Sequence, residues 1–97
     1  MQGILLHMVE MYCLVVGNVQ EVAYRAYVQE SATKLEIVGY VKNLTDGSVV
    51  VVAQGSPDIL KDFVEYLHEG SSLAQVDSVA VDWRSPSRTF HEFSVLH

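Results

Sequence analysis

The chain has 97 residues, 49% of them hydrophobic, and a formal net charge of −6, which fits one small domain with a hydrophobic core. Its six Lys and Arg residues are spread from Arg25 to Arg88 without a cluster, which argues against a nucleic-acid partner. No stretch approaches the ~20 apolar residues that cross a bilayer. The single cysteine, Cys13, excludes an internal disulfide. We therefore expect a cytoplasmic protein with no nucleic-acid or membrane partner and with Cys13 as a buried small hydrophobe.

Residues 1–10 carry no basic leader and are expected to form an N-terminal extension, which need not be ordered, before a single domain over residues 11–97. A buried strand is predicted over residues 11–16, ending at Gly17. Apolar and small residues at helical spacing then predict a helix over residues 22–35. The remaining predicted elements are strands over residues 37–42 and 48–54, a helix over 57–68, and strands over 76–83 and 90–96.

Local signals support these boundaries. Asp46-Gly47 is a hairpin turn signal between two β-rich runs. Ser56 can cap the second helix, Pro57 suits its first position, and Gly70 is a terminator. The element order β-α-β-β-α-β predicts an α+β fold, a ferredoxin-like two-layer sandwich in which two helices cover one face of an antiparallel sheet, with a short additional C-terminal strand.

The stretch GNVQEVAYR, residues 17–25, carries the chemistry. A buried strand ends at a glycine, a short loop follows, and Arg25 lies in the first turn of the next helix. This layout gathers backbone N–H groups and a guanidinium at one place, which is how a protein holds a phosphoryl group without a metal.

Two stretches resemble the signatures of the acylphosphatase family. Residues 17–25 are similar to the phosphate-loop signature of that family, and GYVKNLTDGSV, residues 39–49, followed by Gly55, is similar to its second signature. The resemblance runs from about Met11 to the end of the chain, and the separation of the two stretches fits the family as well.

The resemblance implies a metal-free and cofactor-free hydrolysis of the carboxyl–phosphate anhydride of acyl phosphates, which gives carboxylate and inorganic phosphate. We expect a monomer whose partners are a small-molecule acyl phosphate and inorganic phosphate. The essential arginine and asparagine of the family map onto Arg25 and Asn43. Its phosphate-binding backbone maps onto Gly17, Asn18, Val19, Gln20, Glu21 and Val22.

The chemistry of these side chains agrees with that mapping. A guanidinium offers a fork of donors to two phosphoryl oxygens, and phosphoryl transfer asks a protein mainly for positioning and charge stabilisation. Asn43 ends a predicted strand where a turn begins, so its neutral amide can orient an attacking water. No general base is evident, so the proton of the water can pass to the phosphate itself.

The chain departs from the family at two positions, Glu21 and Glu36, where the family has glycine. Glu21 costs about 1–2 kcal/mol if its position requires a left-handed backbone, and its charge opposes an anion. An alternative function is therefore a phosphate- or acyl-phosphate-binding module with weak or no turnover, which an assay with an aryl acyl phosphate separates from an enzyme. Glu36 is expected in the left-handed position that ends the first helix.

Each assignment has a plainer interpretation. Without the resemblance, Arg25 can be a surface helix residue, Asn43 a turn-starting residue, and Gln20 a loop residue rather than part of the cradle. The four histidines show no metal-ligand spacing. An RNA-recognition module shares the element order, but the predicted strand over residues 48–54 has no aromatic residue on which a base can stack.

Overall fold

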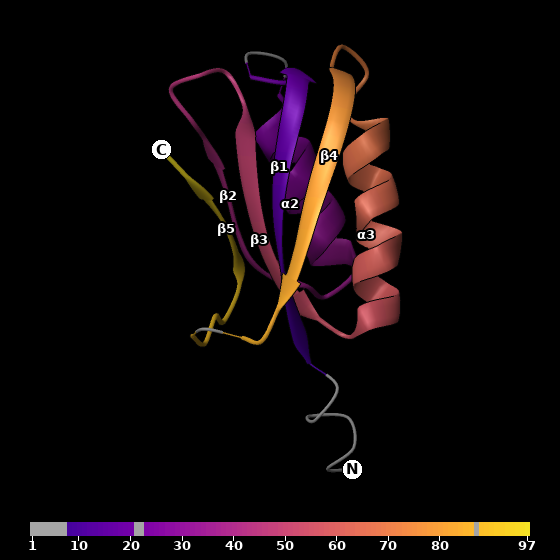
Figure 1. The fold of residues 1–97 in the computed structure, drawn as a ribbon, viewed down its shortest axis with the longest axis vertical. Helices are drawn as coiled ribbons and strands as arrows, with labels where there is room; N and C mark the ends of the chain where they lie inside the picture. Colours follow the sequence, from indigo (N-terminus) through magenta and orange to yellow (C-terminus); the bar gives the residue numbers. More distant parts are fainter. Residues whose placement is uncertain (1–7, 21–22, 87) are drawn as a thin grey trace.

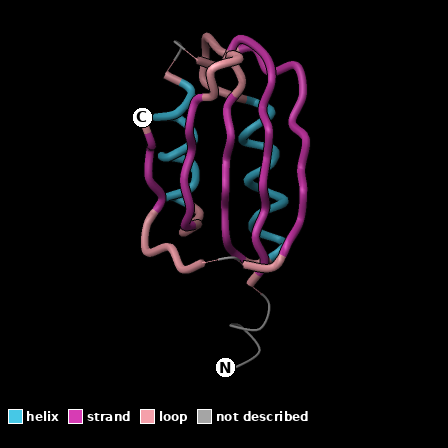
Figure 2. The backbone as a smooth tube through the Cα atoms, turned by 60° about the vertical axis from the view of Figure 1, so that its left-hand side comes forward, coloured by secondary structure: helices cyan, strands magenta, loops and turns pink. Residues whose placement is uncertain are grey.

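Two helices cover one face of a five-stranded sheet in the computed structural model (Figure 1), which describes residues 8–20, 23–86 and 88–97. The turned view shows both helices behind the sheet (Figure 2). The elements are β1 (Val9–Asn18), α2 (Tyr24–Lys34), β2 (Val38–Asn43), β3 (Val49–Gly55), α3 (Pro57–Glu69), β4 (Gln75–Arg84) and β5 (Phe93–Leu96).

The strand order is β4-β1-β3-β2-β5. β1 lies between β3 and β4 and is antiparallel to both, and β2 is antiparallel to β3. This arrangement confirms the predicted ferredoxin-like sandwich. The additional strand β5 joins the outer edge of β2 in parallel, so the sheet is mixed rather than wholly antiparallel.

The core lies between the sheet and the helices. Alternate residues of β1, namely Met11, Cys13 and Val15, are fully buried with Leu60 and Phe63 of α3. Burial raises the pKa of the Cys13 thiol to about 12, so the thiol is protonated at neutral pH. Cys13 is the buried small hydrophobe that was predicted.

No helix among the described residues is long and apolar enough to cross a membrane.

The ends of the helices follow their local signals. Ser56 Oγ accepts a hydrogen bond from Ile59 N at 3.4 Å, and Gly70 closes α3 with a φ of 74°. Glu36 has the predicted left-handed backbone, with a φ of 59°. The predicted start of the first helix at Val22 lies outside the described residues, and α2 begins at Tyr24 after Ala23, whose φ is also 59°.

Two predicted boundaries of β1 are wrong. The strand begins at Val9 rather than Met11, so Val9 and Glu10 of the predicted extension belong to the sheet. It also continues past Gly17 to Asn18, because Gly17 pairs with Val76 across a bulge. A Cβ at Gly17 would lie 2.1 Å from the carbonyl oxygen of Gln75. Glycine is therefore needed here for close strand packing rather than to end the strand.

The final strand is shorter than predicted, since β5 begins at Phe93 rather than at residue 90. Phe90 lies before it, where its ring meets Tyr40 edge-on at 5.9 Å between centroids. The guanidinium of Arg88 lies 4.8 Å from the centroid of the Phe90 ring. Aromatic and cation–π packing thus holds this residue outside the strand ladder.

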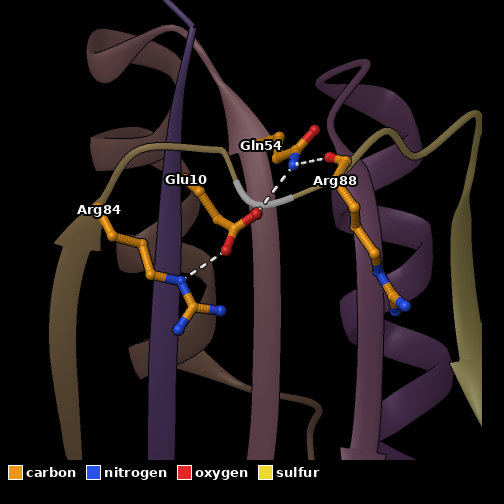
Figure 3. Close-up of polar contacts among 4 residues, drawn as sticks. All are labelled: Glu10, Gln54, Arg84 and Arg88. Carbon is orange, nitrogen blue, oxygen red and sulfur yellow. Dashed lines mark hydrogen bonds and ion pairs between the residues drawn. The ribbon is translucent and has the colours of Figure 1, made fainter.

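A buried carboxylate ties the β4–β5 connection to the sheet (Figure 3). Glu10 is fully buried and accepts hydrogen bonds from Gln54 Nε2 at 2.8 Å and from Arg84 Nε at 2.5 Å. The same Gln54 nitrogen donates to the carbonyl oxygen of Arg88 at 2.6 Å. One cluster thereby links β1 and β3 to Arg84, at the end of β4, and to Arg88, within the segment that leads toward β5.

We expect Arg84→Met to lower the free energy of unfolding by about 2 kcal/mol. Breaking a buried ion pair typically costs about 3–5 kcal/mol, and the figure is reduced because the Arg84 side chain is 41% exposed. Arg88→Met is the matched control, since only the backbone oxygen of Arg88 joins the cluster. It should cost about 0.5–1 kcal/mol, the worth of an exposed cation–π contact. Urea unfolding measures both, and equal losses would contradict a structural role for the Glu10–Arg84 pair.

Candidate functional site

A cavity of about 330 Å³ lies where the segment after β1, the first turns of α2, and the ends of β2 and β5 meet. It brings Arg25 and Asn43 together from different elements, as the sequence predicts. Its lining residues are Val19, Gln20, Ala23, Tyr24, Arg25, Ala26, Gln29, Asn43, Val95 and His97.

Arg25 lies in the first turn of α2, and its guanidinium contacts the C-terminal end of β5 and the residue after it. Its Nη1 donates to the carbonyl oxygen of Leu96 at 2.7 Å and lies 3.4 Å from His97 Nδ1. The neighbouring residue Tyr24 is buried, and its hydroxyl donates to the carbonyl oxygen of Leu67 at 2.7 Å. Burial, and next the nearby Tyr27, raise the pKa of Tyr24, so this hydroxyl stays a donor. The start of α2 and the guanidinium are thus fixed before any ligand binds.

Asn43 is the last residue of β2 and is paired with Val49 of β3. Its side-chain oxygen Oδ1 is buried and accepts no hydrogen bond from the described residues. A buried acceptor without a donor costs about 1–3 kcal/mol, and such groups call for a functional explanation. Because Asn43 lines the cavity, the oxygen is suited to accept a hydrogen bond from a molecule bound there.

The predicted cradle residues separate into three groups. Val19 and Gln20 line the cavity with Arg25. Gly17 and Asn18 pair with β4 and are not among the described residues that line it. Glu21 and Val22 lie outside the described residues. The effect of the Glu21 charge therefore stays a prediction.

Gln20 makes a contact that its sequence position did not reveal. Its Nε2 donates to the carbonyl oxygens of Leu44 at 2.7 Å and Ser48 at 3.0 Å. The sequence suggested a role within the cradle or none, whereas the side chain reaches the turn between β2 and β3. No local pattern signals such a contact, because it joins residues that are distant in the chain.

Leu96 and His97 were also missed. His97 lines the cavity and the carbonyl oxygen of Leu96 binds Arg25 because β5 adds to the edge of β2 in parallel, and no motif marks either residue. Among the described residues, no group of three or more His, Cys, Asp or Glu side chains is placed to hold a metal ion.

The fold and the cavity define a ferredoxin-like protein with a pocket lined by an arginine and by an asparagine whose side-chain oxygen is buried. The family model for acylphosphatase matches residues 11–95. An acylphosphatase from Methanococcoides burtonii is 41% identical over 79 residues, which cover 81% of this chain and 82% of the relative. The chain therefore belongs to the acylphosphatase family, as its two signatures indicate, and the protein is a hydrolase of acyl phosphates.

Solved structures agree with this assignment. The crystal structure of acylphosphatase from Bacillus subtilis superimposes with a TM-score of 0.89 at 34% identity, covering 92% of this chain and 99% of that one. The structure of an acylphosphatase from Coxiella burnetii gives a TM-score of 0.90 at 31% identity, covering 99% of this chain and all of that one.

Proposed function

We propose that acyl phosphates are hydrolysed in the cavity between Arg25 and Asn43, with Arg25 binding the phosphoryl group and Asn43 positioning the attacking water. The observation that carries the proposal is the buried Asn43 Oδ1, an acceptor with no protein donor among the described residues, in the same cavity as the guanidinium. Backbone N–H groups of the segment after β1, where Val19 and Gln20 line the cavity, complete the proposed phosphate site.

Arg25 supplies positive charge where negative charge gathers. A guanidinium has five N–H donors, and the hydrogen bond to Leu96 uses Nη1 while it fixes the plane of the group. The remaining donors can form a fork to two equatorial oxygens of the phosphoryl group. Since the loose transition state spreads charge over these oxygens, the same contacts serve binding and catalysis.

Asn43 supplies direction rather than charge. Its Oδ1 accepts a hydrogen bond from the water and so aims a lone pair of the water oxygen at phosphorus. A new P–O bond forms as the bond from phosphorus to the carboxylate oxygen breaks, and its electron pair leaves with the carboxylate. The described lining of the cavity holds one histidine, His97, beside Arg25 and no Asp or Glu. In the proposed reaction the proton of the water passes to a phosphate oxygen.

A crystal soaked in phosphate or sulfate tests the site. The proposal expects an anion held by Arg25 and the amides after β1, with Asn43 Oδ1 near enough to contact a water on the far side of the phosphorus. An anion bound elsewhere, with this cavity vacant at saturating phosphate, would overturn the proposal.

We also propose that the protein acts as a monomer in the cytoplasm. The edge strand β4 carries Asp77 and Asp82, both exposed. Charged side chains on an edge strand discourage its pairing with an edge strand of a second copy. The buried thiol of Cys13 fits a reducing compartment. Light scattering should give a mass near 10.8 kDa, and a dimer mass would contradict the monomer.

A further inference from the structure

The side chain of Gln20 joins the two halves of the site. It lies on the segment that leads from β1 toward Arg25, and its Nε2 donates two hydrogen bonds to the turn that follows Asn43. We infer that Gln20 is a positioning residue that sets the place of Asn43 in the cavity, an inference that rests on the proposed function.

The geometry of the turn supports this role. Leu44 directly follows Asn43, and Leu44 N donates to the carbonyl oxygen of Ser48 at 2.9 Å. One amide nitrogen of Gln20 therefore contacts the carbonyl oxygens of both residues that close the turn. A primary amide nitrogen has two hydrogens, and the two acceptors at 2.7 and 3.0 Å use both of them. These donors are thus directed at the turn and away from a bound phosphate.

The turn holds its own shape by other contacts. Asp46 Oδ1 accepts hydrogen bonds from Ser48 N at 2.9 Å and Ser48 Oγ at 2.5 Å. These bonds lower the pKa of Asp46, the one from the Ser48 side chain most. Gly47 adopts a φ of 97° that suits glycine. Because these contacts are internal, Gln20 is not needed to form the turn. It fixes where the turn, and with it Asn43, lies relative to α2.

Loss of this contact should therefore affect turnover more than folding or binding. A displacement of a positioned group by about 1 Å can cost up to about 100-fold in rate. Arg25 is anchored separately, through Leu96 and the start of α2. The phosphoryl site should thus persist when the water-positioning group shifts.

The experiment compares Gln20→Ala and Gln20→Met with the parent, with Asn43→Ala and with the double variant Gln20→Ala/Asn43→Ala. Gln20→Met keeps the length of the side chain and removes its donors, so it serves if the alanine variant does not fold. Gln75→Ala is the matched control, since Gln75 is an exposed glutamine of β4 outside the described lining of the cavity.

We expect kcat for an aryl acyl phosphate to fall about tenfold in both Gln20 variants, while the inhibition constant of inorganic phosphate stays within about twofold of the parent. In the double variant, kcat should be less than about twofold lower than in Asn43→Ala alone, because the two residues act as one unit. The side-chain amide resonances of Asn43 should move in Gln20→Met and stay unchanged in Gln75→Ala.

Three outcomes would overturn the inference: kcat unchanged in Gln20→Met, phosphate affinity lost in parallel with kcat, or losses that add fully in the double variant. The second outcome would place Gln20 in direct contact with the anion instead. The proposed function would fail on a different result, namely full turnover in the single variant Asn43→Ala. The side-chain resonances of Asn43 in Gln20→Met test the contact between Gln20 and the turn independently of the activity of Asn43→Ala.

Discussion

Arg25→Ala is expected to lower kcat/KM for an aryl acyl phosphate by about 1,000-fold or more, the worth of an arginine that stabilises phosphoryl transfer. The cavity offers no other Lys or Arg among the described residues that line it, so no neighbouring cation takes over the charge. A net charge of −6 makes the local guanidinium more important, because the rest of the protein repels an anionic substrate. Steady-state kinetics measure the loss.

Arg25→Lys separates charge from geometry. A lysine keeps the positive charge but lacks the fork, so this variant should recover a small part of kcat/KM. Both substitutions also remove the guanidinium bond to Leu96, so urea unfolding must show that the variants are folded under assay conditions. A folded Arg25→Ala variant with more than half of the parent activity would contradict the role given to Arg25.

Asn43→Ala is expected to lower kcat by about 100-fold, similar to the removal of one preorganised polar group in other active sites. Stability should behave differently. The substitution removes a buried oxygen that accepts no hydrogen bond from the described residues, and such a group opposes folding. The free energy of unfolding should stay level or rise by up to about 1 kcal/mol, which is the pattern of a residue kept for function.

Asn43→Asp is the control for charge. It retains the size of the side chain and an acceptor oxygen, but places a carboxylate beside an anion, so we expect KM to rise as well as kcat to fall. Kinetics and urea unfolding of the two variants provide the measurement. If the free energy of unfolding of Asn43→Ala fell by as much as its activation free energy rose, the role of Asn43 would be structural instead.

The features that could be predicted from the sequence depend on short-range chemistry. Ser56 and Gly70 bound α3 because capping needs only neighbouring residues. Glu36 occupies a left-handed position at a helix end, where the family resemblance placed a glycine. The meeting of Arg25 and Asn43 followed from the element order and the two signatures.

The features that were missed depend on contacts between distant segments. Glu10 is a charged residue that the sequence placed in an extension, yet Arg84 and Gln54 make its burial favourable. Gly17 serves packing against β4, which no local pattern distinguishes from a loop glycine. The hydrogen bonds of Gln20 depend on where the turn after β2 lies. Register and side-chain direction across strands decide each of these, and neither can be read from spacing along the chain.

The separate roles of Arg25 and Asn43 are tested most directly by isothermal titration calorimetry, in which inorganic phosphate is titrated into the parent and the two alanine variants. A group that only positions water should contribute little to binding of the product, whereas the phosphoryl-binding group should contribute most of it. We predict no measurable binding to Arg25→Ala and a dissociation constant for Asn43→Ala within about twofold of the parent. Equal losses of phosphate affinity in the two variants would contradict this account.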